Sequence, residues 1–530
     1  MTLQSMRTQL VLTAALVGSH AAMAGTDTWF TPLTESAPVV GPNAVEELAT
    51  PWVTPAGLSQ KNAVSMREVE DAVLSPNQSV VRIDPSQVGR SKTQASMFDM
   101  IAYNPAGDFL FIPHETPFGA GVSRYSVYDN HCEVIFQGDE GGAVGDWSND
   151  FGAFDPCRFT PNGTLFLGEE WAGMGRIVEV LNPFAPVGEV EFRVLDSIAN
   201  VSHEGINFSK KFDDTIYFVD ENSSGSIYKF VMAEAGDYTV GQTFVLSVDD
   251  FTGAASAGYD TADVRTGAAT WVPLTDQAGN PLEGIRDPFT DDFGNPNARA
   301  GRDAADDAGG TPYGRPEDMA VGRLGNGNEV LYFTATSEAT VYSVEILEEK
   351  VRGKGKAWGA RFNPRRRGRG PVNGNAFGTE SQPTGEAIVR VFIDNDSPKN
   401  EGFDPTTGVL NSPDNLAIDA LGNIYVIEDA PNGSSTGGDI WFVRDLDGDG
   451  AGESLDHFMS IRVDGSEATG MIWNPAIPTE FAVCVQHPDS TNLDNVPEGL
   501  GDAVWIFNVT PIDNQGFVHA LNKAEAPFGE

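Results

Sequence analysis

The amino-acid sequence predicts an all-β protein, a six-bladed β-propeller with long rim loops. A two-strand motif recurs six times along the chain, and 58 glycines and 33 prolines supply many turns. Hairpins of this kind cannot bury both of their faces alone, and radial packing of blades around a channel is a common solution for a long chain rich in turns. A length of 530 residues is compatible with this fold, because propellers often exceed the size of an average domain.

Each repeat carries an acidic residue in its second position, continues as a short apolar stretch, turns, and ends in a second strand. The six copies are FDMIAYNPAGDFLFIPHE from Phe98, FDPCRFTPNGTLFLGEE from Phe154, HEGINFSKKFDDTIYFVDE from His203, PEDMAVGRLGNGNEVLYFTATSE from Pro316, PDNLAIDALGNIYVIED from Pro413 and SEATGMIWNPAIPTEFAVCVQH from Ser466. Their acidic second residues are Asp99, Asp155, Glu204, Glu317, Asp414 and Glu467. Because equivalent strand starts lie around one rim of a propeller channel, we expect a ring of carboxylates at its centre.

The spacing of the repeats divides the chain into a propeller and several additional segments. Residues 1–24 combine one Arg, a short apolar run and an A-x-A cleavage pattern, which predicts a secretory signal peptide. An N-terminal extension, partly irregular, is expected over residues 25–95, and the propeller domain over residues 96–530. Insertions are expected at about 235–314 and 352–373, and residues 287–310 of the first insertion are predicted to form a long loop.

The charge of the chain restricts its partners. With 33 Lys and Arg against 76 Asp and Glu, the net charge is −43, which argues against nucleic acid as a partner. No segment after the signal peptide is apolar enough to span a membrane. We therefore expect an exported monomer, periplasmic or extracellular. Of three cysteines, Cys132 and Cys157 could form a disulfide, and Cys484 is expected to be a buried thiol.

A ring of carboxylates requires compensation, by protonation or by bound cations. Oxygen ligands favour calcium or magnesium, and ferric iron also accepts carboxylates. A second layer of acids ends the second strands: Glu115, Glu169, Glu170, Asp220, Glu221, Glu428 and Asp429, with His487 closing the last copy. Because side chains alternate along a strand, only one of each adjacent pair can face the centre.

One cation accompanies the predicted ring. Arg315 stands two residues before Glu317, so both side chains point the same way on an extended strand. A planar, bidentate cation next to metals is suited to holding a phosphate or a carboxylate. The alternative is an arginine that only offsets surplus acid.

A separate acidic loop has the spacing of a calcium site. In DLDGDGAGESLD, the candidate ligands are Asp445, Asp447, Asp449 and Asp456. The preceding DIWFVR is a predicted strand, so the surroundings differ from those of a helix-loop-helix site. We expect a calcium-stabilised hairpin between blade strands, with an unoccupied acidic turn as the alternative.

The repeats also carry a family resemblance. CRFTPNGTLFLGEE, SHEGINFSKKFDDTIYFVDE, GRPEDMAV, SPDNLAIDALGNIYVIED and SEATG followed by VQHP occur in this order from about Phe98 to Pro488. In these segments the chain resembles the PhoX-type alkaline phosphatases, exported propeller enzymes that use calcium and iron. The resemblance implies hydrolysis of small phosphate esters at a metal cluster in the propeller centre.

Site residues are carried over from this resemblance position by position. It implies that Glu317 and Arg315 are catalytic, with Arg315 binding the phosphate of the substrate. The implied metal ligands are Cys157, Glu170, Glu204, Glu317 and Asp414, with Asp220 or Glu221 as a further ligand. Cys157 is the position implied to bind iron.

Two other functions are compatible with the sequence. SPDNLAIDALGNIYV is also similar to blades of calcium-dependent lactonases of the gluconolactonase kind. A non-catalytic propeller with structural metals, whose rim loops bind a partner, is the second alternative. Serine-triad and zinc-protease chemistry has no support, because the sequence has no G-x-S-x-G elbow between a predicted strand and a predicted helix, and no H-E-x-x-H motif.

Overall fold

The computed structural model describes residues 26–71, 97–171, 173–289, 299–352, 379–429, 435–491, 496, 498–511 and 516–525. The predicted signal peptide and nearly all of the predicted insertion at 352–373 lie outside these residues. Within the described chain, no helix is both long and apolar enough to cross a membrane.

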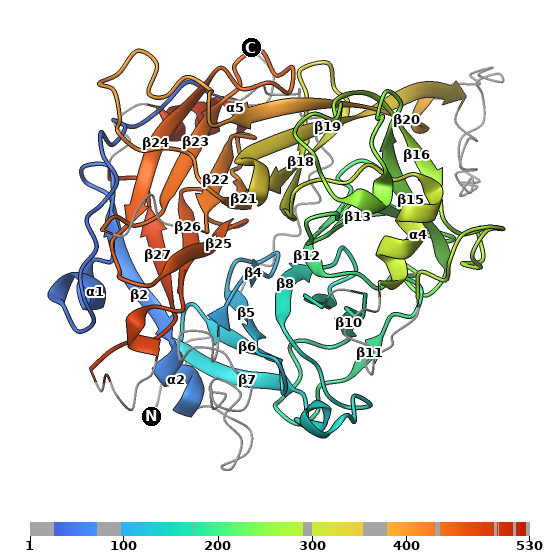
Figure 1. Ribbon diagram of the computed structural model, residues 1–530. Coiled ribbons are helices and arrows are strands. Elements are labelled where there is room, and N and C mark those ends of the chain that lie inside the picture. The colour runs from blue at the N-terminus through green and yellow to red at the C-terminus, as the bar shows by residue number, and fades with distance from the viewer. Residues whose placement is uncertain are drawn as a thin grey trace, which may run out of the picture.

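The fold is all-β, and its sheets are arranged around a central region in a propeller-like way (Figure 1). The first two repeats form separate sheets, one of β3 (Met97–Phe98), β4 (Ala102–Tyr103), β5 (Phe109–Glu115), β6 (Gly121–Ser126) and β7 (His131–Gln137), the other of β8 (Phe154–Phe159), β9 (Leu165–Glu169), β10 (Ile177–Val180) and β11 (Phe192–Val194). All six predicted strand pairs are present, each beginning within two residues of its predicted start.

The third and fourth repeats share one nine-stranded sheet. Its strands are β12 (His203–Phe208), β13 (Thr215–Asp220), β14 (Ile227–Met232), β15 (Gly241–Val248), β16 (Gly267–Pro273), β20 (Thr379–Asp394), β19 (Thr340–Arg352), β18 (Glu329–Ala335) and β17 (Pro316–Arg323), in that order. The pairing of β16 with β20 joins the two halves at their outer edges. The described residues therefore form four separate sheets and one continuous nine-stranded sheet. The prediction of six separate blades was wrong for the third and fourth repeats, which are joined in the nine-stranded sheet.

The last two repeats are completed by strands from the beginning of the chain. In one sheet, β1 (Trp52–Val53) pairs with β24 (Ser454–Ile461), outside β23 (Asp439–Arg444), β22 (Ile424–Glu428) and β21 (Pro413–Ile418). In the other, β2 (Ser59–Ser65) pairs with β27 (Ala503–Asn508), outside β26 (Glu480–Gln486) and β25 (Glu467–Trp473). The two ends of the chain are thus tied together by backbone hydrogen bonds.

Among the residues that the structure describes, helices are few and peripheral: α1 (Val45–Ala49), α2 (Met66–Asp71), α4 (Ala300–Ala308) and α5 (Phe517–Glu525). Helix α4 lies within residues 287–310, where the sequence predicted a loop. Its buried face is formed by Ala300, Ala304 and Ala305, small residues at helical spacing. Alanine has the highest helix propensity of all residues, which explains a helix without large apolar side chains.

The hydrophobic core lies between neighbouring repeats and not in one central mass. Six buried clusters fill the spaces between successive sheets or sheet halves. For example, Val330 and Tyr332 of β18 share a cluster with Val426 of β22 and Trp441 of β23. Since the apolar faces are buried laterally, the inner ends of the first strands are free to carry polar side chains.

The inner strands β12 and β17 approach each other closely. A Cβ atom at Gly205 would lie 2.8 Å from the backbone N of Met319 and 2.9 Å from the carbonyl O of Glu317. The Asn207 Nδ2 donates to the Met319 carbonyl at 2.5 Å across the same contact. Only glycine fits at position 205.

Gly205→Ala is expected to separate β12 from β17 and to lower the free energy of unfolding by about 1–3 kcal/mol, the usual cost of overpacking. The midpoint of urea unfolding measures this effect. Gly41→Ala is the matched control, because an added Cβ there meets nothing within 4 Å. Equal midpoints for the two variants would contradict the close packing of these strands.

Candidate functional site

The inner ends of the strands enclose a cavity of about 380 Å³. Nine carboxylates line it: Asp99, Glu115, Asp155, Glu170, Glu204, Glu317, Asp414, Asp429 and Glu467. Arg315, Gln486 and His487 are also part of the lining. The repeat-leading acids expected to form a ring are thus gathered around one cavity, together with acids from the ends of second strands.

Local backbone irregularities aim the leading acids at the cavity. The pairing register shifts between Phe154 and Cys157, His203 and Ile206, Pro316 and Met319, and Pro413 and Asn415, so each shift spans one of these acids. A β-bulge of this kind bends the strand and redirects a side chain. Ala153, Arg315 and Ser412, each two residues before such an acid, have left-handed φ angles of 47°, 55° and 47°.

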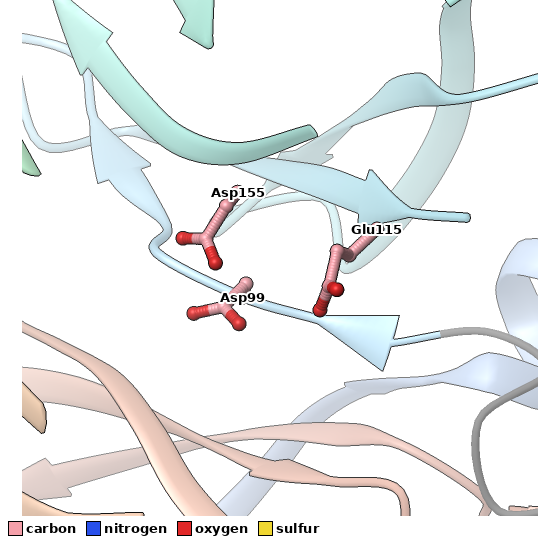
Figure 2. A group of neighbouring side chains, drawn as sticks. All are labelled: Asp99, Glu115 and Asp155. Atoms are coloured by element: carbon pink, nitrogen blue, oxygen red, sulfur yellow. The ribbon is translucent and has the colours of Figure 1, made fainter. Parts of the chain in front are cut away.

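The carboxylates form three groups that share members. Asp99, Glu115 and Asp155 form the first group (Figure 2), Asp155, Glu170 and Glu204 the second, and Glu204, Glu317 and Asp414 the third. Within each group, one oxygen from every residue lies within 4.8 Å of the others. Asp155 and Glu204 each belong to two groups, which is the arrangement expected of carboxylates that bridge adjacent cations.

Burial and mutual repulsion make ionisation of these groups unfavourable. Burial, reinforced by the charges of neighbouring acids, raises the pKa of Asp155, Glu170, Glu204, Glu317 and Asp414 well above the usual range. Burial raises the pKa of Asp99 to about 6, although hydrogen bonds from Thr469 and Gln486 oppose this. Only protons or cations can neutralise such a set.

The chemistry of the donors fits hard cations. All nine carboxylates offer oxygen, the ligand atom that calcium, magnesium and ferric iron accept. The Asp155 Oδ1 is buried and accepts no hydrogen bond. A buried carboxylate oxygen without a donor costs free energy unless something else is bound there. This supports the assignment of the cavity as a metal centre.

Arg315 is the cation beside this set. Its Nε lies 2.5 Å from the Glu221 Oε1 and its Nη2 lies 3.1 Å from the Glu317 Oε1, while 41% of its side chain remains exposed. Two carboxylates therefore fix the guanidinium plane on one side. The exposed part can meet an anionic ligand in the cavity.

A family comparison matches most of the chain. The model of the family described as Alkaline phosphatase PhoX matches residues 130–489. The chain belongs to this family.

Solved structures are similar to the chain at low sequence identity, and the first of them shows the same fold. Pseudomonas fluorescens PhoX in complex with vanadate, a transition state analogue, has a TM-score of 0.54 and 14% identity, covering 93% of this chain and 100% of that one. A gluconolactonase from Xanthomonas campestris has a TM-score of 0.38 and 9% identity, covering 93% of this chain and 99% of that one. No curated protein matches the sequence.

The structure brings most of the residues implied by the PhoX resemblance together: Glu221 is not part of the cavity lining but contacts Arg315, and two further residues lie elsewhere. Cys157 lies in the apolar cluster between the first two sheets, and burial raises the pKa of its thiol. Asp220 is fully buried and pairs with Arg302, 2.6 Å from each of its carboxylate oxygens. Neither residue lines the cavity. All three cysteines are free thiols, so Cys132 and Cys157 are not bonded to each other.

Other cavity residues were not among the ligands implied by the resemblance. Asp99 and Asp155 are leading acids, and the repeat had already placed them in the expected ring of carboxylates. Gln486, which donates to Asp99 at 2.6 Å and to Glu115 at 3.3 Å, had no such signal. Its role depends on the meeting of the first and last repeats, which no local pattern reveals.

The acidic hairpin between β23 and β24 forms a second, separate cluster. Asp445, Asp447 and Glu453 each offer an oxygen within 4.8 Å of the others. Asp456, expected from the loop spacing, instead lies in β24, where it accepts from Arg444 at 3.2 Å and Ser454 at 2.8 Å. Asp449 accepts from the backbone N–H of Ala451. Glu453 occupies the ninth position of the twelve-residue pattern, which often contributes through water, and it was not among the expected ligands.

In the metal-free protein, stability is expected to fall as the pH rises from 5 to 8. Carboxyls of the unfolded chain ionise near pH 4, whereas burial raises the pKa of Asp99 to about 6 and the pKa values of Asp155 and Glu204 well above their usual range. The folded state therefore binds more protons, and the free energy of unfolding decreases with pH in this window. Urea midpoints measured in chelator test this, and added calcium should remove the slope. A midpoint that rises with pH in chelator would contradict it.

If the hairpin binds calcium through the observed cluster, Glu453→Gln is expected to lower the calcium stoichiometry by one without unfolding the protein. Asp456→Asn should leave the stoichiometry intact but lower the melting temperature with or without calcium, because it weakens the contact with Arg444. Equilibrium dialysis and thermal unfolding distinguish the two variants. Loss of a calcium ion in Asp456→Asn alone would support the sequence-based ligand set instead.

Proposed function

We propose that this chain is an exported, metal-dependent phosphomonoesterase that hydrolyses small phosphate esters in its central cavity. Membership of the PhoX family supports a phosphatase, and the predicted signal peptide supports export to the periplasm or the extracellular space. The observation that carries the proposal is the combination of three connected carboxylate groups with one partly exposed arginine beside them.

The proposed metal ligands are the members of these groups, with Asp155 and Glu204 as bridging residues. Glu170, Glu317 and Asp414 would complete the two groups nearer Arg315. Calcium is the main proposed metal, and ferric iron is proposed as a second because it also accepts carboxylates. When bound, such cations would act as Lewis acids that neutralise charge on the phosphoryl oxygens.

Arg315 is proposed to orient the phosphoryl group. Glu221 and Glu317 fix its guanidinium, so no reorientation is needed when substrate arrives. A guanidinium can donate two parallel hydrogen bonds to a phosphate, which lysine cannot. The same carboxylates keep the arginine from binding anions in the wrong orientation. Positioning of this kind makes a large contribution in phosphoryl transfer.

The alternatives of a lactonase and of a non-catalytic module are separated by the same experiment. Protein purified without chelators is analysed for its elements and then assayed with an aryl phosphate and with a sugar lactone. Calcium or iron together with phosphate release supports the proposal. Lactone hydrolysis alone, or metals without any turnover, would contradict it.

Arg315→Ala and Glu317→Gln are each expected to reduce kcat/KM for an aryl phosphate by about 100-fold or more, the usual cost of removing one preorganised stabilising group. Arg315→Ala should keep its metal content, whereas Glu317→Gln should lose part of it. The exposed residue Glu283 provides a control, as Glu283→Gln should behave like the wild type. Full activity in either of the first two variants would overturn the assignment.

A further inference from the structure

Adjacent acids end the second strands of three repeats, and the structure gives the two members of each pair different surroundings. The pairs lie at the ends of the strands, Glu169 and Glu170 at β9, Asp220 and Glu221 at β13, and Glu428 and Asp429 at β22, and the first member of each is the last residue of its strand. The first member of every pair is fully buried. The second members line the cavity or, in the case of Glu221, hold its arginine.

The buried acid of the middle pair is held by the inserted helix α4. The Arg302 Nε and Nη2 each lie 2.6 Å from one oxygen of Asp220, a bidentate contact between residues 82 positions apart. The side chain of Arg302 is 5% exposed and that of Asp220 is 0% exposed. Both charged groups are shielded from water, so each is stabilised mainly by the other. The pair is therefore expected to hold the two side chains in this one geometry.

Asp220 in turn fixes the backbone that carries Glu221. Its Oδ1 accepts the backbone N–H of Ser202 at 3.1 Å, and the carbonyl of Ser202 accepts the N–H of Glu221 at 2.9 Å. The carbonyl of the next residue, Asn222, accepts the backbone N–H of Arg315 at 3.0 Å. The turn after β13 therefore holds both the backbone and, through Glu221, the side chain of Arg315.

Arg315 needs such external support. Its φ of 55° lies in the left-handed region, which is unfavourable for a residue other than glycine. A conformation of this kind persists only where neighbouring contacts hold it in place. Here the contacts with Asn222, Glu221 and Glu317 hold Arg315 in this conformation.

We propose that Arg302 is a positioning residue for Arg315, acting through Asp220 and the turn to Glu221, and that Asp220 is a structural anchor and not a metal ligand. This inference rests on the proposed function of Arg315 as the phosphate-binding cation. It assigns the insertion containing α4 a role in phosphate recognition, although the helix itself lies outside the cavity.

The other two pairs use the same device with different donors. Arg176 donates to both oxygens of Glu169 at 2.6 and 2.7 Å, next to Glu170 in the cavity. The Trp441 indole N–H donates to Glu428 at 2.8 Å, next to Asp429. In each case a buried donor from the framework fixes the first acid and leaves the second for the cavity.

The test compares Arg302→Lys with the wild type in inorganic phosphate binding, measured by calorimetry on the metal-loaded protein. Lysine keeps the charge that Asp220 needs but cannot make the two-point contact. We expect the dissociation constant of phosphate, and KM for an aryl phosphate, to rise by about tenfold with unchanged metal content. In an Arg315→Ala background, Arg302→Lys should have no further effect, since coupled residues are not additive.

Arg286→Gln is the matched control. Arg286 also binds α4, at 2.8 Å from both Asp303 and Asp307, but it does not contact Asp220. Arg286→Gln removes these exposed contacts but keeps the buried pair of Arg302 with Asp220, so it should leave phosphate affinity unchanged. Should Arg302→Lys fail to fold, the neutral pair Arg302→Met with Asp220→Asn replaces it with the same expectation.

Two results would overturn the inference. One is an unchanged phosphate dissociation constant in Arg302→Lys, and the other is stoichiometric loss of a metal ion in Asp220→Asn, which would make Asp220 a ligand. Failure of the proposed function looks different, because the wild type would then bind phosphate without hydrolysing its esters. The effect of Arg302 on phosphate binding can be measured in that case as well.

Discussion

The mutual repulsion of the cavity carboxylates is the constraint on which this structure depends. Nine acids line a space of about 380 Å³. Burial raises the pKa values of the leading acids, so their ionisation is unfavourable. A flexible framework would relieve such crowding by moving the side chains apart into water. The acids stay together because the strand ends that carry them are fixed from outside.

That fixation comes from the lateral packing of the sheets. Six apolar clusters join each repeat to the next, and β1 and β2 tie the beginning of the chain to the last two sheets. In such a ring, one strand start cannot withdraw from the cavity without disturbing two neighbouring cores. The packing at Gly205 shows that β12 and β17 can hardly move relative to each other, because there is no room between them even for one additional methyl group. The repulsion among the carboxylates at the centre is therefore opposed by the burial of apolar side chains between the sheets.

Sequence patterns revealed the strands and the leading acids, because both follow from local periodicity. The pairing of β16 with β20 could not be read in this way, since it joins edges separated by more than a hundred residues. The bulges were equally hidden, although they decide which residue faces the cavity: the shift between Phe154 and Cys157 leaves Asp155 at the centre. For adjacent acids, alternation predicts that one faces inward but not which one.

The position of Cys157 has a consequence for the kind of metal site. A thiolate ligand favours soft metals, whereas Cys157 lies in an apolar cluster that raises its pKa and so keeps the thiol protonated. The residue of the same strand that reaches the cavity is Asp155, which belongs to two of the three carboxylate groups. Its second oxygen allows one side chain to serve two cations, which a thiol in the core cannot do. The donors that this strand presents to the cavity are therefore carboxylate oxygens, the ligand type that hard cations accept, and not a thiolate.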